Sequence, residues 1–232
     1  MSIIRNTIDF EEEMKPIVME NMSAIVRSTF NIPRATSYSC FDEINGGFGV
    51  VDVFFYKLKK GYMNQRADTG IVGRKEAVET LMMFNNEGTT SFTYLRENLP
   101  YSGERLRSIL RENMKVGAIR QVDNDSYEKV YEVGYESSLS IELKLRDWKK
   151  GLYQAYRYKW FSDASYLGLY SPYAEQAKRN IRMFETYNVG LMEIFDNGKI
   201  ELIHKPTVEK PLSEKMRITT NESLVQRLWS VD

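Results

Sequence analysis

The sequence has very little cysteine and histidine. Cys40 is its one cysteine and His204 its one histidine. A single thiol excludes an intrachain disulfide and a zinc site built from several cysteines, and a single imidazole excludes histidine clusters and relays between two histidines. Enzyme classes that depend on such sites are therefore excluded.

An excess of charge of one sign is also missing, because 32 lysines and arginines balance 32 aspartates and glutamates. Any binding of nucleic acid must then come from local patches. No apolar run approaches the roughly 18 residues of a membrane span, and charges from Arg5 to Glu13 leave no visible signal peptide. We therefore expect a soluble cytoplasmic protein with no membrane attachment.

What is present is typical of a globular protein. The chain has 232 residues, of which 42% are hydrophobic and 28% charged. This length allows one large or two small domains, each with its own core.

Residue periodicity predicts a mixed α/β protein. Helices are expected over residues 7–30, 147–161 and 173–187. Strands are expected over 35–44, 48–56, 140–145, 165–170, 189–195 and 199–204. Residues 206–232 are weakly patterned, with a short amphipathic stretch over 224–229.

The middle of the chain has a different character. Helices are predicted over 73–86, 90–99 and 104–115, followed by a polar hairpin around 121–127. This order resembles a winged helix-turn-helix, which implies DNA contact by the third helix. The basic residues there are Arg105, Arg107, Arg111 and Lys115. Because winged helices also serve as protein-contact modules, a partner-binding role stays open.

Two stretches carry carboxylates in unusual surroundings. In the strand Ser140 to Leu145, Glu142 and Lys144 leave one face because side chains alternate along a strand. Asp52 is the one charge in the apolar strand over 48–56. A buried carboxylate needs a partner or a metal, so Asp52 is either a hydrogen-bonded structural residue or a metal ligand. An E-x-K triplet taken alone is usually a pair of solvent-exposed charges with no catalytic role.

Asp52 followed by Glu142-Leu143-Lys144 resembles the PD-(D/E)xK nuclease superfamily, the restriction-endonuclease-like fold, whose core order is αβββαβ. Gln154 and Tyr158 resemble the Q-x-x-x-Y signature of one branch of it. The resemblance covers about residues 8–60 and 136–205. It implies that the winged helix is inserted between the second and third strands. The expected domains are a nuclease core over 1–60 and 136–205, a winged helix over 61–135 and a C-terminal extension over 206–232.

The resemblance also implies the roles of the site residues. Asp52, Glu142 and the Leu143 carbonyl would hold Mg²⁺ or Mn²⁺, since oxygen ligands suit these ions. Lys144 would orient or deprotonate the attacking water. Glu20 corresponds best to the family's acidic residue on the first helix, with Glu11, Glu12 and Glu13 as competing positions. Gln154 and Tyr158 would steer the DNA strand, and the basic residues near them are Lys149 and Lys150.

The predicted function is a metal-dependent DNA endonuclease whose winged helix positions the substrate. The alternative is a catalytically silent DNA-binding regulator or partner-binding protein on a nuclease fold. Cleavage of both strands by one active site per chain would favour a homodimer. For the strand pair that carries the site, we predict an antiparallel register with Asp52 opposite Leu143.

Overall fold

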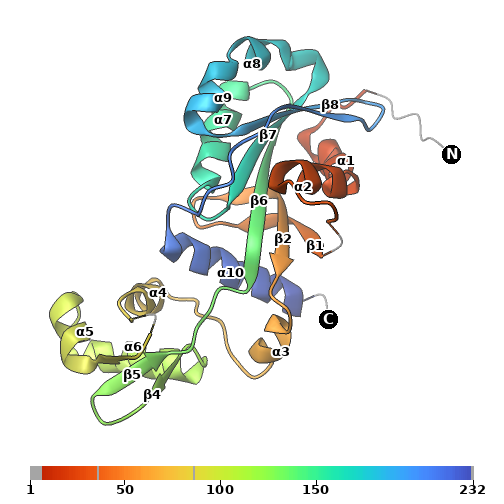
Figure 1. The fold of residues 1–232 in the computed structure, drawn as a ribbon. Helices are drawn as coiled ribbons and strands as arrows, with labels where there is room; N and C mark the ends of the chain where they lie inside the picture. The colour runs from red at the N-terminus through yellow and green to blue at the C-terminus, as the bar shows by residue number, and fades with distance from the viewer. Residues whose placement is uncertain (1–6, 36, 86, 231–232) are drawn as a thin grey trace. The chain divides into compact units, whose positions relative to one another are not determined.

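The computed structural model describes residues 7–35, 37–85 and 87–230. The chain divides into two compact units, one from residues 1–58 and 135–213 and the other from residues 59–134 and 214–232 (Figure 1). Position 36 of the predicted strand over 35–44, position 86 of the predicted helix over 73–86, and the ends of the predicted domains lie outside the described residues.

The first unit is built on a six-stranded mixed sheet in the order β1-β2-β6-β7-β8-β9. Its strands are β1 (Tyr38–Asn45), β2 (Val50–Leu58), β6 (Tyr135–Lys144), β7 (Ala164–Tyr170), β8 (Gly190–Ile194) and β9 (Ile200–His204). The β6–β7 and β7–β8 pairs are parallel, and the other pairs are antiparallel. The mixed α/β class predicted from the sequence is confirmed.

Helices cover both faces of this sheet (Figure 1). On one face α1 (Met14–Glu20) and α2 (Met22–Phe30) pack against alternate residues of the central strands, including Ile141 and Leu143. On the other face lie α7 (Trp148–Tyr158), α8 (Glu175–Arg179) and α9 (Ile181–Tyr187), packed against Leu167 and Leu169. Because β6 has Leu143 on the first face, Glu142 and Lys144 emerge on the face covered by α7.

Two helices predicted as continuous are interrupted by asparagines. The helix predicted over 7–30 consists of a 3₁₀ turn, η1 (Glu11–Glu13), then α1 and α2, which meet at Asn21. The helix predicted over 173–187 is likewise divided at Asn180, after the 3₁₀ turn η2 (Ser171–Tyr173). Both asparagine side chains donate to the carbonyl four residues earlier, and such local bonds compete with a regular helix.

The second unit contains α3 (Tyr62–Arg66), α4 (Lys75–Met82), α5 (Phe92–Asn98) and α6 (Gly103–Lys115). A small antiparallel sheet has the order β3-β5-β4, from β3 (Thr89–Ser91), β4 (Ile119–Gln121) and β5 (Ser126–Lys129). Helices α5 and α6 begin at serine caps: Ser91 accepts from Tyr94 N and Ser102 accepts from Arg105 N. The strand β3 was not predicted from the sequence.

The C-terminal residues, which were predicted as a separate extension, are divided between the two units. Residues 206–213 belong to the first unit, and residues 214–232 to the second. The short amphipathic stretch is part of a longer helix, α10 (Glu214–Trp229). Ile218 of this helix joins the apolar core of the second unit, and Lys215 Nζ lies 2.5 Å from Glu79 Oε1 of α4.

Candidate active site

The register between β2 and β6 brings the two predicted carboxylates to one face of the sheet. Val53 lies opposite Ile141, so the next position along places Asp52 level with Glu142. The predicted register, with Asp52 opposite Leu143, is wrong by one residue. A shift of one residue would have sent Asp52 to the opposite face.

The main chain of β6 holds the Asp52 side chain directly. Leu143 N donates to Asp52 Oδ2 over 2.7 Å. Lys144 Nζ lies 2.5 Å from Glu142 Oε1 and donates to Leu143 O over 2.9 Å. Asp52, Glu142 and Lys144, which were singled out in the sequence, therefore lie in one contact network around Leu143.

Burial and like charge together affect the protonation of this network. Burial, followed by the charge of Glu142, raises the pKa of Asp52 to about 6. Burial lowers the pKa of Lys144, but its bond with Glu142 and the charges of Glu142, Glu11 and Asp52 outweigh that effect and raise it. The lysine is therefore held as a cation.

Helix α7 covers Glu142 with a tyrosine. Burial, and then the charge of Glu142, raises the pKa of Tyr158. Its hydroxyl contacts Glu142 Oε2 and also lies 3.0 Å from Val50 O. A phenol has one proton, so it donates to only one of these acceptors at a time. One turn earlier on α7, Gln154 has a buried Oε1 with no hydrogen-bond partner in the described part of the chain.

The acidic residue that reaches Lys144 is Glu11 of η1. Its Oε2 lies 3.3 Å from Lys144 Nζ, and its Oε1 accepts from Leu145 N over 3.2 Å. Glu20, the predicted ligand, is exposed at the last residue of α1. At 1.5 Å per residue it lies roughly 14 Å further along this segment. Of the acids considered from the sequence, Glu11 is thus the one whose described contacts reach Lys144.

The donor set is compatible with a hard divalent cation. Asp52, Glu142 and the Leu143 carbonyl supply only oxygen atoms, which Mg²⁺ and Mn²⁺ prefer. The pKa of Asp52 is raised by burial first and by the charge of Glu142 second, and a bound divalent cation would offset both effects on the carboxylate. No group of three or more acidic, histidine or cysteine side chains that could hold a metal occurs among residues 7–35, 37–85 and 87–230. A metal here would thus need the carbonyl and water as well as the two carboxylates.

The predicted DNA-binding residues lie on two helices. On α6, Arg105 is paired with Glu76 at 3.1 Å, whereas Arg107 stacks over Phe92 with its guanidinium 4.2 Å from the ring centre. Arg111 and Lys115 follow Arg107 at intervals of four, so these three exposed residues share one helix face. The exposed lysines at the start of α7 are Lys149 and Lys150.

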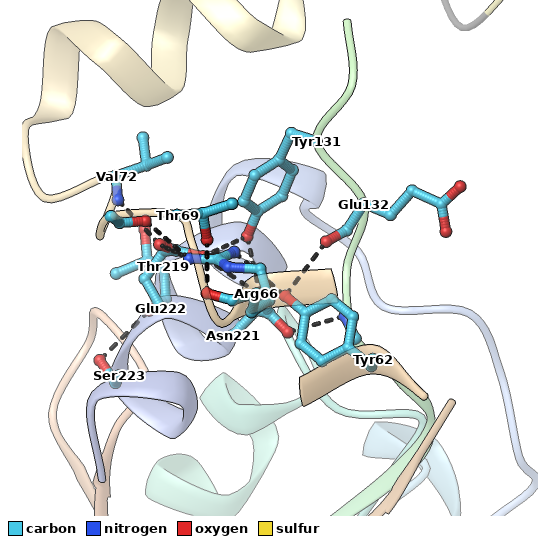
Figure 2. Close-up of polar contacts among 12 residues, drawn as sticks. Tyr62, Arg66, Thr69, Val72, Tyr131, Glu132, Thr219, Asn221, Glu222 and Ser223 are labelled. Carbon is cyan, nitrogen blue, oxygen red and sulfur yellow. Dashed lines mark hydrogen bonds and ion pairs between the residues drawn. The ribbon is translucent and has the colours of Figure 1, made fainter. Parts of the chain in front are cut away.

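The second unit buries an ion pair that the sequence did not indicate (Figure 2). Arg66 donates to Glu222 Oε1 over 2.9 Å and to Glu222 Oε2 over 3.0 Å. Arg66 is 7% exposed and Glu222 is 4% exposed. Burial lowers the pKa of Arg66, but Glu222 more than reverses this. The pair fixes α10 to the last residue of α3.

Uncharged groups complete this cluster. Tyr131 donates to Glu222 Oε1 over 2.8 Å, and Asn221 donates to the hydroxyls of Tyr62 and Tyr131. Beside the cluster lies a cavity of about 230 Å³, whose walls include Tyr62, Arg66 and Tyr131. Four of the five guanidinium hydrogen-bond donors of Arg66 are used within the unit. The arrangement is that of a structural clamp.

Comparison with known proteins gives no relative: no protein-family model, no curated protein and no solved structure matches this chain. Among the described residues, no helix has the length and apolar character needed to cross a membrane.

Proposed function

We propose that the protein is a metal-dependent DNA endonuclease of the PD-(D/E)xK type. The observation that carries the proposal is that Asp52 of β2 lies on the same face of the sheet as Glu142 and Lys144 of β6, far from it in sequence, beside the Leu143 carbonyl. Two carboxylates and a carbonyl can hold a metal that activates water for phosphodiester hydrolysis, and a lysine beside them can stabilise the charge that develops.

The fold supports the same proposal. A helix, three strands, a helix and a strand, in the order α1–α2, β1, β2, β6, α7, β7, agree with the αβββαβ core of the restriction-endonuclease-like fold. The second unit is inserted between β2 and β6. Its order α4, β3, α5, α6, β4, β5, with β5 between the other two strands, supports a winged helix.

Each residue then has a role that follows from its contacts. Asp52 and Glu142, with Leu143 O, would hold Mg²⁺ or Mn²⁺. The bound ion would neutralise charge on the phosphate and lower the pKa of a water. Lys144 remains protonated, so it stabilises developing negative charge and orients the water by donating hydrogen bonds. Tyr158 positions Glu142 by contacting the carboxylate oxygen that Lys144 leaves free.

One observation favours the alternative of a catalytically silent DNA-binding protein. The Lys144 ammonium already bonds Glu142 Oε1 and Leu143 O, two of the three proposed ligand groups. A resident cation there would replace the metal, unless Lys144 turns towards the phosphate when DNA and metal bind.

A single experiment separates the two functions. Linear, supercoiled, branched and single-stranded DNA are incubated with Mg²⁺ or Mn²⁺ and the wild type, Glu142→Ala or Lys144→Ala. We expect wild-type cleavage of at least one substrate and none by the variants. Equal inertness of all three proteins, with DNA binding retained, would overturn the endonuclease in favour of the silent binding protein.

A further inference from the structure

The hairpin between β1 and β2 presents an aromatic side chain to solvent close to the candidate active site. Phe48 is 42% exposed, although it lies four residues before Asp52. Trp160, which follows α7, is 36% exposed, and its ring meets that of Phe48 edge-on with centroids 5.6 Å apart. Isolated exposed aromatics are common, but two in mutual contact form a surface able to bind a ligand.

The hairpin is held in place by the end of α7. Gly46 lies against the buried ring of Phe161, so closely that an added Cβ would come within 2.2 Å of it. Arg157 donates to Phe48 O, and its guanidinium carbon lies 5.2 Å from the Phe48 ring centre. The exposed ring is therefore fixed before any ligand arrives, which lowers the entropy lost on binding.

The same segment of α7 holds the candidate active site. Tyr158, the residue after Arg157, contacts both Glu142 Oε2 and Val50 O. The positions of the hairpin and of Glu142 are therefore fixed by adjacent residues of one helix.

We propose that Phe48 and Trp160 form a stacking platform for an unpaired base of the DNA strand bound at the candidate active site. This inference rests on the proposed function and deepens it, because it specifies the substrate as DNA with unpaired nucleotides beside the cleaved bond. In a duplex the faces of a base are covered by its neighbours, so a protein ring stacks readily only on a base that is unpaired or turned out.

The charge beside the platform favours DNA over another apolar partner. Arg157 is exposed, and its described contacts are with the Phe48 carbonyl and ring and not with a carboxylate. Its positive charge complements the phosphates that flank a stacked base. A protein partner or a second copy of the chain would gain little from an arginine at the centre of the contact unless it supplied a carboxylate.

The test measures base stacking separately from cleavage. With EDTA present, the full-length protein is titrated with a short thymidine oligonucleotide and with a matched one that lacks bases at its central positions. Binding is followed by tryptophan fluorescence and by anisotropy of a dye on the DNA. Phe48→Leu tests the platform, Trp160→Phe assigns the fluorescence change, and Tyr94→Leu, which alters an exposed tyrosine of α5, is the matched control.

We expect Phe48→Leu to weaken thymidine binding at least about fivefold, the lower limit for loss of one stacked base, and to leave abasic binding unchanged. A base stacked beside Trp160 should quench its fluorescence, so Trp160→Phe should remove this quenching. Tyr94→Leu should change neither the fluorescence nor the anisotropy signal. Equal affinity of the wild type for both oligonucleotides would overturn the platform. So would a dimer, seen by ultracentrifugation, that Phe48→Leu dissociates.

The two proposals fail in different ways. If binding depends on the bases but no DNA substrate is cleaved with either metal, the stacking platform is supported and the endonuclease is overturned. Cleavage that depends on Glu142 but is indifferent to unpaired bases would do the reverse.

Discussion

The two units each bury a charged cluster, and the clusters are built on opposite principles. In the second unit one arginine faces one glutamate through two hydrogen bonds, and neutral groups make most of the remaining hydrogen bonds. In the first unit Lys144 faces Glu142 and Glu11, and burial, followed by the charge of Glu142, raises the pKa of the neighbouring Asp52. The first cluster therefore has an excess of negative charge, whereas the second is balanced.

This difference separates a structural site from a candidate functional one. Burying a balanced pair costs hydration free energy, which the attraction and hydrogen bonds between the two charges offset. Removing one partner leaves an uncompensated buried charge. An excess of buried carboxylate works against folding, and perturbed groups of this kind concentrate at functional sites. The comparison predicts that variants of the first cluster lose activity and variants of the second lose stability.

The largest expected effect is on DNA cleavage. Glu142→Gln keeps the shape of the side chain but removes a charge that would bind the metal, so we expect cleavage to fall at least about a hundredfold. Glu222→Gln is the matched substitution in the second cluster. Assayed where it remains folded, as checked by circular dichroism, it should cleave at the wild-type rate. Similar losses in the two variants would remove the distinction between the clusters.

The stability of the protein, by contrast, should depend on the second cluster. Arg66→Met leaves Glu222 buried without its partner, so we expect the free energy of unfolding to fall by about 3–5 kcal/mol in a urea titration. The double variant Arg66→Met, Glu222→Leu removes both charges and should recover part of this loss. If the double variant loses more stability than the summed losses of Arg66→Met and Glu222→Leu, the pair is not a self-contained clamp.

The pH dependence of stability sharpens the contrast further. The Asp52 pKa rises from 3.8 to about 6 on folding, so the folded state binds a proton more tightly than the unfolded state. Its stabilising contribution is complete below pH 3.8 and is lost as pH rises through about 6. In EDTA, we expect the wild type to lose roughly 2 kcal/mol relative to Asp52→Asn over this range, after allowance for partial exposure. Parallel pH profiles of the two proteins would contradict the raised pKa.

The smallest effects concern the helices that would contact phosphates. Arg111→Gln on α6 and Lys149→Gln on α7 each remove one exposed cation. Each should reduce the slope of log affinity against log salt by about 1 if its residue meets a phosphate. Measuring both slopes on one uncleaved duplex shows which unit contacts DNA. An unchanged slope for Arg111→Gln would favour a protein-contact role for α6.

The sequence predicted the parts of the site that depend on local pattern. Alternation along a strand placed Glu142 and Lys144 on one face, and periodicity predicted the helix over 147–161 in which α7 lies. The apolar surroundings of Asp52 identified it as unusual. These predictions needed only neighbours in sequence.

Long-range features escaped prediction because nothing local specifies them. The register of β2 against β6 is set by packing across the whole sheet, and a one-residue error was enough to misplace Asp52. Glu11 was one of four competing acids on the first helix, and only the path of the chain selects it. Arg66 and Glu222 lie 156 positions apart, with no motif to connect them.

The central claim is that Asp52 and Glu142 hold a divalent cation, and Mn²⁺ binding followed by electron paramagnetic resonance tests it most directly. We compare the wild type with Asp52→Asn, Glu142→Gln and, as a control, Glu20→Gln. The account predicts a Mn²⁺ site in the wild type that survives Glu20→Gln and is lost in the other two variants. Absence of binding in the wild type, or binding unchanged in all four proteins, would contradict it.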